Sequence, residues 1–168
     1  MIIRAAAKGD AKALSDLATA TYQEAFGLSL SAGDLAAYLS ANLSEACFET
    51  FMDEDVNLIA EMDDRVVGYV QFGAVSVPVE TVSADREVRR LYVHPEFQGR
   101  GVGKRLLDAA LEHPQLKTAG SIYLDVWERN HGALRLYRRY GFEVIGAHRF
   151  EVQSGAPTDL DLIMLRRS

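Results

Sequence analysis

Apolar residues recur every three or four positions in some parts of the chain and form strand-like runs in others. The first periodic segment predicts a helix after a short strand at residues 2–3, with Asp10 placed to cap the helix and Gly27 to end it. Two shorter helical patterns follow at 35–39 and 46–52. The start of the chain is therefore expected to be mainly helical.

Strand patterns dominate the next part of the sequence. Segments rich in β-branched and aromatic residues cover 57–61, 66–72, 87–93, 122–126, 142–145 and 160–165. Asp63 and Asp64 predict a hairpin turn between the first two segments. Helical patterns return at 101–114 and 130–140, so a strand, helix, strand unit lies in the middle of the chain. This order predicts one mixed α/β (α+β) domain over residues 1–168, with antiparallel strands first and a parallel crossover later.

Composition fits an ordinary globular protein and excludes several other classes. Of 168 residues, 48% are hydrophobic and 25% are charged. No apolar run approaches the roughly 20 residues of a membrane helix, and the first residues lack the order of a secretion signal, so a cytoplasmic protein with no membrane partner is expected. The single cysteine, Cys47, cannot form an internal disulfide, and the four histidines show no metal-ligand spacing, so no metal site is expected.

Charge is distributed unevenly along the sequence. The formal net charge is −6, yet residues 86–105 hold six cations against two acids. A general nucleic-acid binder would carry a net basic domain, so this local basic stretch indicates a small polyanion instead. Residues 1–64 hold three cations against twelve acids, which fits either a solvated surface or a surface that attracts cations.

A glycine-rich turn lies inside the basic stretch, between a predicted strand and a predicted helix. Glycines let the backbone approach a ligand closely, and the first amides of a helix point at whatever lies there, which favours a phosphate group. Two common phosphate motifs are not matched. Lys104 and Leu106 stand where a dinucleotide fingerprint would need glycine, and Arg105 stands where a nucleotide triphosphate loop would need Ser or Thr.

The same segment carries a family resemblance. The pattern Q-x-x-G-x-G at 98–103, preceded by Arg-Leu-Tyr-Val-His-Pro at 90–95, resembles the acetyl-coenzyme A signature of the GNAT superfamily of N-acetyltransferases. The later residues Asn130, Ala133, Leu136, Tyr137, Gly141 and Phe142 are similar to the second signature of that family. The resemblance is carried by roughly residues 86–145.

A narrower likeness concerns the second half of the chain. The segments 126–130, 146–150 and 158–164 look like those of PaiA-type spermidine/spermine acetyltransferases. The first half of the chain offers no motif that would test this subtype.

The superfamily resemblance implies a fold and a cosubstrate. The fold would be a mixed central sheet of about six to seven strands, with parallel strands 4 and 5 splayed apart and about four to five flanking helices. The cosubstrate would be acetyl-CoA. Its pantetheine arm would pair with the backbone of Leu91, Tyr92 and Val93. Its pyrophosphate would be bound by Gln98, Gly99, Arg100, Gly101, Val102, Gly103 and Lys104, with Arg100 and Lys104 adding positive charge.

The resemblance also implies catalytic roles. Asn130 would contact the cofactor, and Tyr137 would place its hydroxyl near the thioester sulfur. A thiol has a pKa of about 8.5 and tyrosine about 10, so Tyr137 can act mainly as a hydrogen-bond donor to the departing thiolate, or simply pack under the cofactor. Glu87 would be the base or would hold a water. A glutamate pKa of about 4.3 lies about six units below that of an alkylammonium, which favours a water relay; pairing of Glu87 with Arg89 is the alternative.

The expected function is transfer of acetyl from acetyl-CoA to a primary amine by direct attack in a ternary complex. The acidic first third of the chain favours a cationic acceptor such as a polyamine. Two alternatives are a protein or peptide N-terminal acetyltransferase and a non-catalytic acyl-CoA sensor. A homodimer is plausible for the family, and no nucleic-acid partner is expected.

Overall fold

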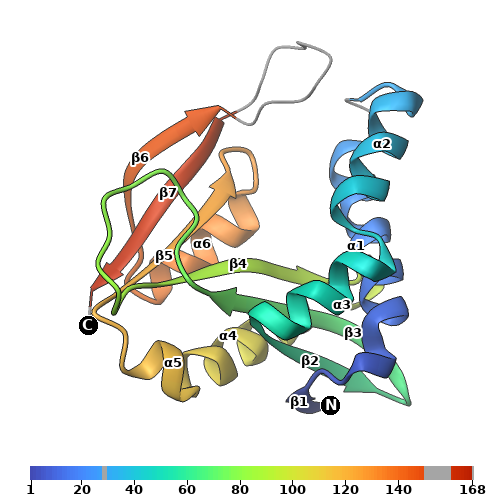
Figure 1. The fold of residues 1–168 in the computed structure, drawn as a ribbon, viewed down its shortest axis with the longest axis horizontal. Helices are drawn as coiled ribbons and strands as arrows, with labels where there is room; N and C mark the ends of the chain where they lie inside the picture. The colour runs from blue at the N-terminus through green and yellow to red at the C-terminus, as the bar shows by residue number, and fades with distance from the viewer. Residues whose placement is uncertain (28–29, 150–159, 168) are drawn as a thin grey trace. The chain divides into compact units, whose positions relative to one another are not determined.

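Strands and helices follow one another along the chain in much the order that the hydrophobic pattern predicts. The computed structural model describes residues 1–27, 30–149 and 160–167, and Figure 1 shows the elements. The strands are β1 (Ile2–Ala5), β2 (Val56–Met62), β3 (Arg65–Gly73), β4 (Arg86–Val93), β5 (Ser121–Trp127), β6 (Glu143–Arg149) and β7 (Leu160–Arg167). The helices are α1 (Ala11–Phe26), α2 (Ala32–Asn42), α3 (Glu45–Glu54), α4 (Val102–Glu112), the single-turn α5 (Pro114–Lys117) and α6 (His131–Arg139), with 3₁₀ turns η1 (Lys8–Asp10) and η2 (Pro95–Phe97).

The predicted class and strand count are confirmed. The chain divides into two compact units, one made of Met1–Phe72 and Arg90–Leu111 and the other of Gly73–Arg89 and Glu112–Ser168. Pairing follows the order β1-β2-β3-β4 in the first unit and β4-β5-β7-β6 in the second, which makes a mixed seven-stranded sheet. That residues 1–168 fold as one domain stays a prediction.

An aromatic core fills the first unit. The helical spacing of Leu14, Ala18 and Tyr22 buries one face of α1, where it packs with Phe48 and Tyr69. The Tyr69 ring stands edge-on to Phe48, with centroids 5.6 Å apart. Complete burial raises the pKa of Tyr69 well above its usual range. These residues cover the face of the sheet that lies opposite α4.

Gly68 of β3 allows the other face of this unit to pack closely. A Cβ atom at this position would lie 2.9 Å from the carbonyl oxygen of Tyr92 and 3.0 Å from Leu106 Cδ1. A side chain there would therefore force β4 or α4 to move. Glycine at this position keeps α4 against the sheet and so sets where its first turn lies.

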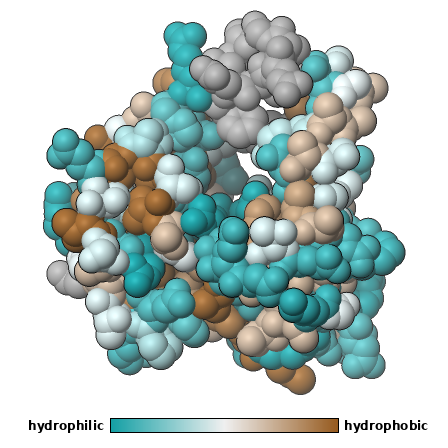
Figure 2. Space-filling model, in the orientation of Figure 1, coloured by the Kyte–Doolittle hydropathy of each residue, from teal (hydrophilic) through white to brown (hydrophobic). Residues whose placement is uncertain are grey.

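The second unit has a smaller apolar cluster. Val77 packs with Tyr123, Ile163 and Leu165, so the segment between β3 and β4 covers this face of β5 and β7. Figure 2 shows apolar residues gathered where this segment runs in Figure 1. β5 and β7 pair antiparallel over seven residue pairs, from Ser121↔Arg167 to Trp127↔Asp161.

No helix within the described ranges is long and apolar enough to cross a membrane.

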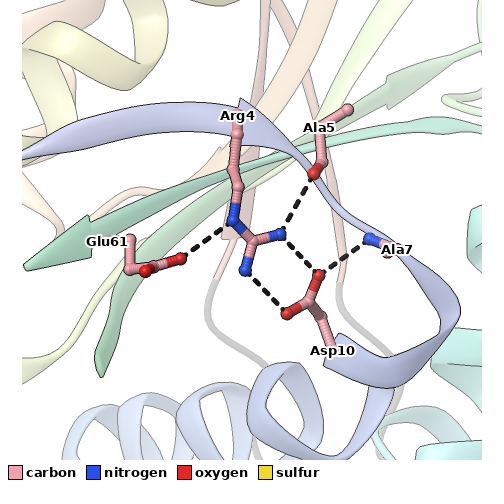
Figure 3. A network of polar contacts seen from close by, with 5 residues as sticks. All are labelled: Arg4, Ala5, Ala7, Asp10 and Glu61. Atoms are coloured by element: carbon pink, nitrogen blue, oxygen red, sulfur yellow. Dashed lines mark hydrogen bonds and ion pairs between the residues drawn. The ribbon is translucent and has the colours of Figure 1, made fainter. Parts of the chain in front are cut away.

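The predicted capping role of Asp10 is wrong. Asp10 precedes α1, but its backbone is helical (φ −87°, ψ −8°) and its side chain makes no capping bond to α1. Instead its carboxylate accepts hydrogen bonds from Arg4 Nη1 at 2.8 Å and from the Ala7 amide at 2.7 Å, while Arg4 Nε donates to Glu61 at 2.8 Å (Figure 3). The Asp10 carboxylate thus bonds to two groups that precede it, six and three residues earlier in the chain, and not to the helix that follows.

The Arg4–Asp10 pair predicts an acid-sensitive contribution to stability. The hydrogen bond from Arg4 and that from Ala7 hold the pKa of Asp10 below its usual range. The contribution is therefore present above the unfolded pKa of about 3.9 and is lost as the pH falls through the lower folded value. We expect Asp10→Asn to lower the free energy of unfolding by about 1 kcal/mol at pH 7, a modest figure because the Arg4 side chain is 40% exposed.

Urea unfolding at pH 7 and pH 2 measures this difference. Asp16→Asn is the matched control, because Asp16 pairs with Lys12 while 65% exposed, and it should change stability by less than about 0.5 kcal/mol. A destabilisation by Asp10→Asn that persisted at pH 2 would contradict the assignment.

Candidate functional site

The glycine turn connects η2 to α4 in the first unit. Gly99 and Gly101 have φ values of 71° and 80°, in the left-handed region that favours glycine. A Cβ atom at either position would meet nothing within 4 Å. Backbone conformation, and not crowding, is therefore what requires glycine here.

The first amides of α4 emerge from this turn. The Arg105 amide donates to the Gly101 carbonyl at 3.1 Å and so begins the hydrogen-bond ladder of the helix. The amides of Val102, Gly103 and Lys104 precede that ladder, and the helix dipole adds partial positive charge at the same end. This is the arrangement that binds a phosphate or diphosphate group.

Side chains hold the turn in position. Gln98 Nε2 donates to the Val93 carbonyl at 3.2 Å and so links the turn to the end of β4. The Arg100 guanidinium lies 5.5 Å from the centroid of Phe97, a cation–π distance. Lys104 Nζ lies 2.8 Å from Asp108 Oδ2, one helical turn further on. Of the two cations predicted to add charge, Lys104 is thus partly neutralised by its own helix.

β4 is bonded along one edge to β3. The His94 amide donates to the Val67 carbonyl at 2.9 Å, directly after the half-buried residues 91–93. At the other end of β4, within the second unit, the parallel register with β5 comprises Arg86↔Ile122 and Glu87↔Tyr123. The predicted parallel pairing of strands 4 and 5 is confirmed, and it is short.

A chain of polar side chains centred on the buried Gln71 anchors β4 in the first unit. Arg90 Nη1 donates to Gln71 Oε1 at 2.6 Å, and Gln71 Nε2 donates to Asp55 Oδ2 at 2.7 Å. The Arg90 guanidinium also lies 4.6 Å from the centroid of Phe51. Sequence reasoning missed this chain; the one available signal is Gln71, a polar residue inside an otherwise apolar strand.

Glu87 is buried in the second unit, with 3% of its surface exposed. Its carboxylate accepts hydrogen bonds from the Ser76 amide, from the Ser76 hydroxyl at 2.9 Å and from the Val77 amide at 3.1 Å. Arg89 Nη1 donates to the same Ser76 hydroxyl at 2.9 Å. Glu87 and Arg89 therefore share Ser76 as a partner, and both hold the segment after β3.

α6 carries the other two predicted site residues. Tyr137 is 6% exposed, and its ring meets Phe142 edge-on with centroids 5.8 Å apart. Asn130 is exposed and precedes the first helical residue, and its Oδ1 accepts from the Ala133 amide at 3.0 Å. Asn130 therefore caps α6 from outside the helix, whereas the predicted helix at 130–140 included it.

The predicted site residues fall into two sets. Residues 91–93 and 98–104 lie in the first unit, where Gln98 joins the two segments. Glu87, Asn130 and Tyr137 lie in the second unit. Of the segments that carry the PaiA-type likeness, Phe150, Thr158 and Asp159 lie outside the described residues.

Comparisons with known proteins agree with this geometry. The sequence profile of the acetyltransferase (GNAT) family matches residues 13–142. An uncharacterized N-acetyltransferase from Mycobacterium tuberculosis is 30% identical over 164 residues, which cover 94% of this chain and 97% of that protein. The chain belongs to the GNAT acetyltransferase family. It is an N-acetyltransferase that uses acetyl-CoA.

Two further similarities concern subtype and fold. The spermine/spermidine N(1)-acetyltransferase of Bacillus subtilis is 40% identical over 58 residues, which cover 34% of this chain and 38% of that enzyme. The crystal structure of the PaiA N-acetyltransferase from Thermoplasma acidophilum, in complex with coenzyme A, superposes with a TM-score of 0.77 at 20% identity, covering 99% of this chain and 98% of that one. The second similarity confirms the predicted fold.

The left-handed glycines predict a specific defect in cofactor binding. In Gly101→Ala the turn of the unbound protein would move away from the left-handed φ of 80°. Cofactor binding would then have to restore this φ, which costs a residue with a Cβ atom about 1–2 kcal/mol. We expect Gly101→Ala to weaken coenzyme A binding about 5- to 30-fold in calorimetry.

Gly9→Ala is the matched control. Its Cβ also meets nothing within 4 Å, but Gly9 has no left-handed φ, so affinity should change less than about twofold. Wild-type affinity in Gly101→Ala would show that the turn does not hold the cofactor in this conformation.

Proposed function

We propose that this enzyme transfers the acetyl group to a primary amine by direct attack within a ternary complex, and that the acceptor is a cationic amine of the polyamine class. The observation that carries the proposal is the left-handed glycine turn ahead of α4, in a chain of the GNAT family. It supplies the diphosphate site that acetyl-CoA requires.

Each half of the cofactor has a matching group in the first unit. The pyrophosphate is bound by the amides of Gln98, Gly99, Arg100, Gly101, Val102, Gly103 and Lys104. Arg100 adds positive charge. Lys104 adds its charge only when its ammonium group exchanges the ion pair with Asp108 for the phosphate. The pantetheine amides pair with the backbone of Leu91, Tyr92 and Val93, as an added strand would.

The chemical step needs no covalent enzyme intermediate. The acceptor ammonium first gives one proton to water. The freed lone pair then attacks the thioester carbonyl carbon, the C–S bond breaks so that coenzyme A leaves as a thiolate, and the attacking nitrogen loses its second proton to water. Tyr137 donates a hydrogen bond to the sulfur as negative charge develops there, and Asn130 contacts the cofactor. Because a thiol is more acidic than a tyrosine hydroxyl, the donated bond stabilises the thiolate without complete proton transfer.

Glu87 acts through a water in this proposal. A direct transfer from an alkylammonium to an ordinary carboxylate would be uphill by about 8 kcal/mol. The three hydrogen bonds from Ser76 and Val77 all go to one carboxylate oxygen, Oε2, so the other oxygen, Oε1, keeps a lone pair that can accept from a relaying water. Glu87 then accepts a hydrogen bond from the relaying water and does not take the proton from the amine directly.

The acceptor class rests on charge and on one partial similarity. Residues 1–64 hold twelve acids against three cations, and a surface of this sign concentrates cationic substrates. The 58-residue segment similar to the Bacillus subtilis spermine/spermidine enzyme supports the same class.

The role of Tyr137 predicts a loss of turnover without a loss of binding. We expect Tyr137→Phe to lower kcat by about 10²-fold, because one charge-stabilising donor is removed in the transition state. Calorimetry with coenzyme A should show a Kd within about twofold of wild type, since the phenyl ring still packs on Phe142. Tyr123→Phe, at another buried tyrosine of the same unit, is the control and should leave kcat within about twofold. Equal kcat values for wild type and Tyr137→Phe would contradict the role of the Tyr137 hydroxyl as a donor to the sulfur.

The charge argument predicts an acceptor preference. Spermidine should give a kcat/KM at least about tenfold higher than a neutral monoamine of similar length, and the ratio should fall as salt is raised. Release of coenzyme A thiol measures both rates. Preference for neutral or anionic amines, or for peptide N-termini, would contradict a cationic acceptor. If none of these amines leads to release of coenzyme A thiol, the result supports the sensor alternative.

A further inference from the structure

Three side chains of the metal-ligating kind meet on the last three strands of the second unit. They are Asp125 of β5, His148 of β6 and Asp161 of β7, each half-buried. One ligand atom from each lies within 4.8 Å of the others. The shortest contact is 3.2 Å, between His148 Nε2 and Asp125 Oδ2. None of the three belongs to the residues assigned to acetyl transfer.

Strand register explains why these residues meet. Asp161 lies opposite His148 on one side and opposite Trp127 on the other, while Asp125 lies opposite Ile163, two residues along β7 from Asp161. Because side chains alternate between faces, the three lie on one face of the sheet. The imidazole and the Asp125 carboxylate meet across β7, from which Asp161 projects beside them.

We propose that Asp125, His148 and Asp161 bind one divalent first-row transition-metal ion, with Zn²⁺ as the representative ion. One imidazole nitrogen and two carboxylate oxygens suit such ions, whereas Mg²⁺ and Ca²⁺ prefer oxygen ligands alone. Three protein ligands would leave at least one coordination position for water.

Distances favour a metal ion over an ammonium group. Zn–N and Zn–O bonds of about 2.1 Å in a tetrahedral site place neighbouring ligand atoms about 3.4 Å apart. The observed 3.2 Å between His148 and Asp125 is close to this value, so a metal can replace the proton between them with little movement. An ammonium with hydrogen bonds of about 2.8 Å holds its acceptors about 4.6 Å apart. It would have to push the same two atoms apart by more than about 1 Å.

The strands also restrict what must move on binding. β5 and β7 pair over seven residue pairs, and β6 pairs with β7 through His148↔Asp161. The Cα positions of the three ligands are thus fixed before the ion arrives. Closing the remaining separation, at most 4.8 Å, to about 3.4 Å then requires the Asp161 carboxylate to move by no more than about 1.4 Å toward the other two ligand atoms.

Calorimetry with ZnCl₂ on tag-free, metal-depleted protein tests the proposal. Wild type should bind one Zn²⁺ per chain, and both His148→Gln and Asp161→Asn should bind at least about tenfold more weakly. His131→Gln and Glu143→Gln are matched controls, because both residues are exposed and lie in the same unit, and they should retain wild-type affinity. Circular dichroism spectra of His148→Gln and Asp161→Asn that match that of wild type show that a loss of binding is not due to misfolding.

Other results would overturn the proposal. Absence of zinc binding by wild type, or equal binding by wild type, His148→Gln and Asp161→Asn, rules the site out. If spermidine and not Zn²⁺ binds wild type and both variants lose it, the cluster is an ammonium site instead. Zinc binding is measured without any acetyl transfer, so its outcome is independent of the proposed acceptor.

Discussion

The backbone amides at the start of α4 are the constraint on which the rest of this structure depends. A helix that begins directly after two left-handed glycines presents three backbone donors and its positive dipole end at one point. Gly101 offers no side chain that could cap the helix from that position. A diphosphate is the kind of ligand that accepts from such donors and meets the positive end of a helix dipole.

The surrounding residues of the first unit keep that end in place. Gly68 allows α4 to pack against the sheet, and Gln98 joins the turn to the last carbonyl of β4. The chain from Arg90 through Gln71 to Asp55 holds the same strand from its other face. In the second unit Glu87 and Arg89 hold the segment after β3 in the same way, and this explains why a carboxylate expected to act as a base accepts three hydrogen bonds at its Oε2 atom.

How much could be predicted from sequence depended on the range of the interaction. Elements and the glycine turn follow from local periodicity and from the special freedom of glycine, and both were predicted close to where they lie. Asp10 was assigned wrongly because Arg4 competes for it, and the capping position of Asn130 could not be separated from a helical one by spacing alone. The partners of Glu87 and the group of Asp125, His148 and Asp161 depend on strand register. No local spacing could reveal them, because His148 and Asp125 are 23 residues apart.

The central claim is that the turn before α4 binds the diphosphate of the acyl carrier, and a comparison of two ligands tests it most directly. Pantetheine has the arm of coenzyme A but no diphosphate, so it keeps the contacts to β4 and loses those to α4. Two lost charge-assisted hydrogen bonds are worth about 3 kcal/mol or more, so calorimetry should show coenzyme A binding at least about 100-fold more tightly than pantetheine. Equal affinity for the two ligands, or no binding of coenzyme A to the folded protein, would contradict the account.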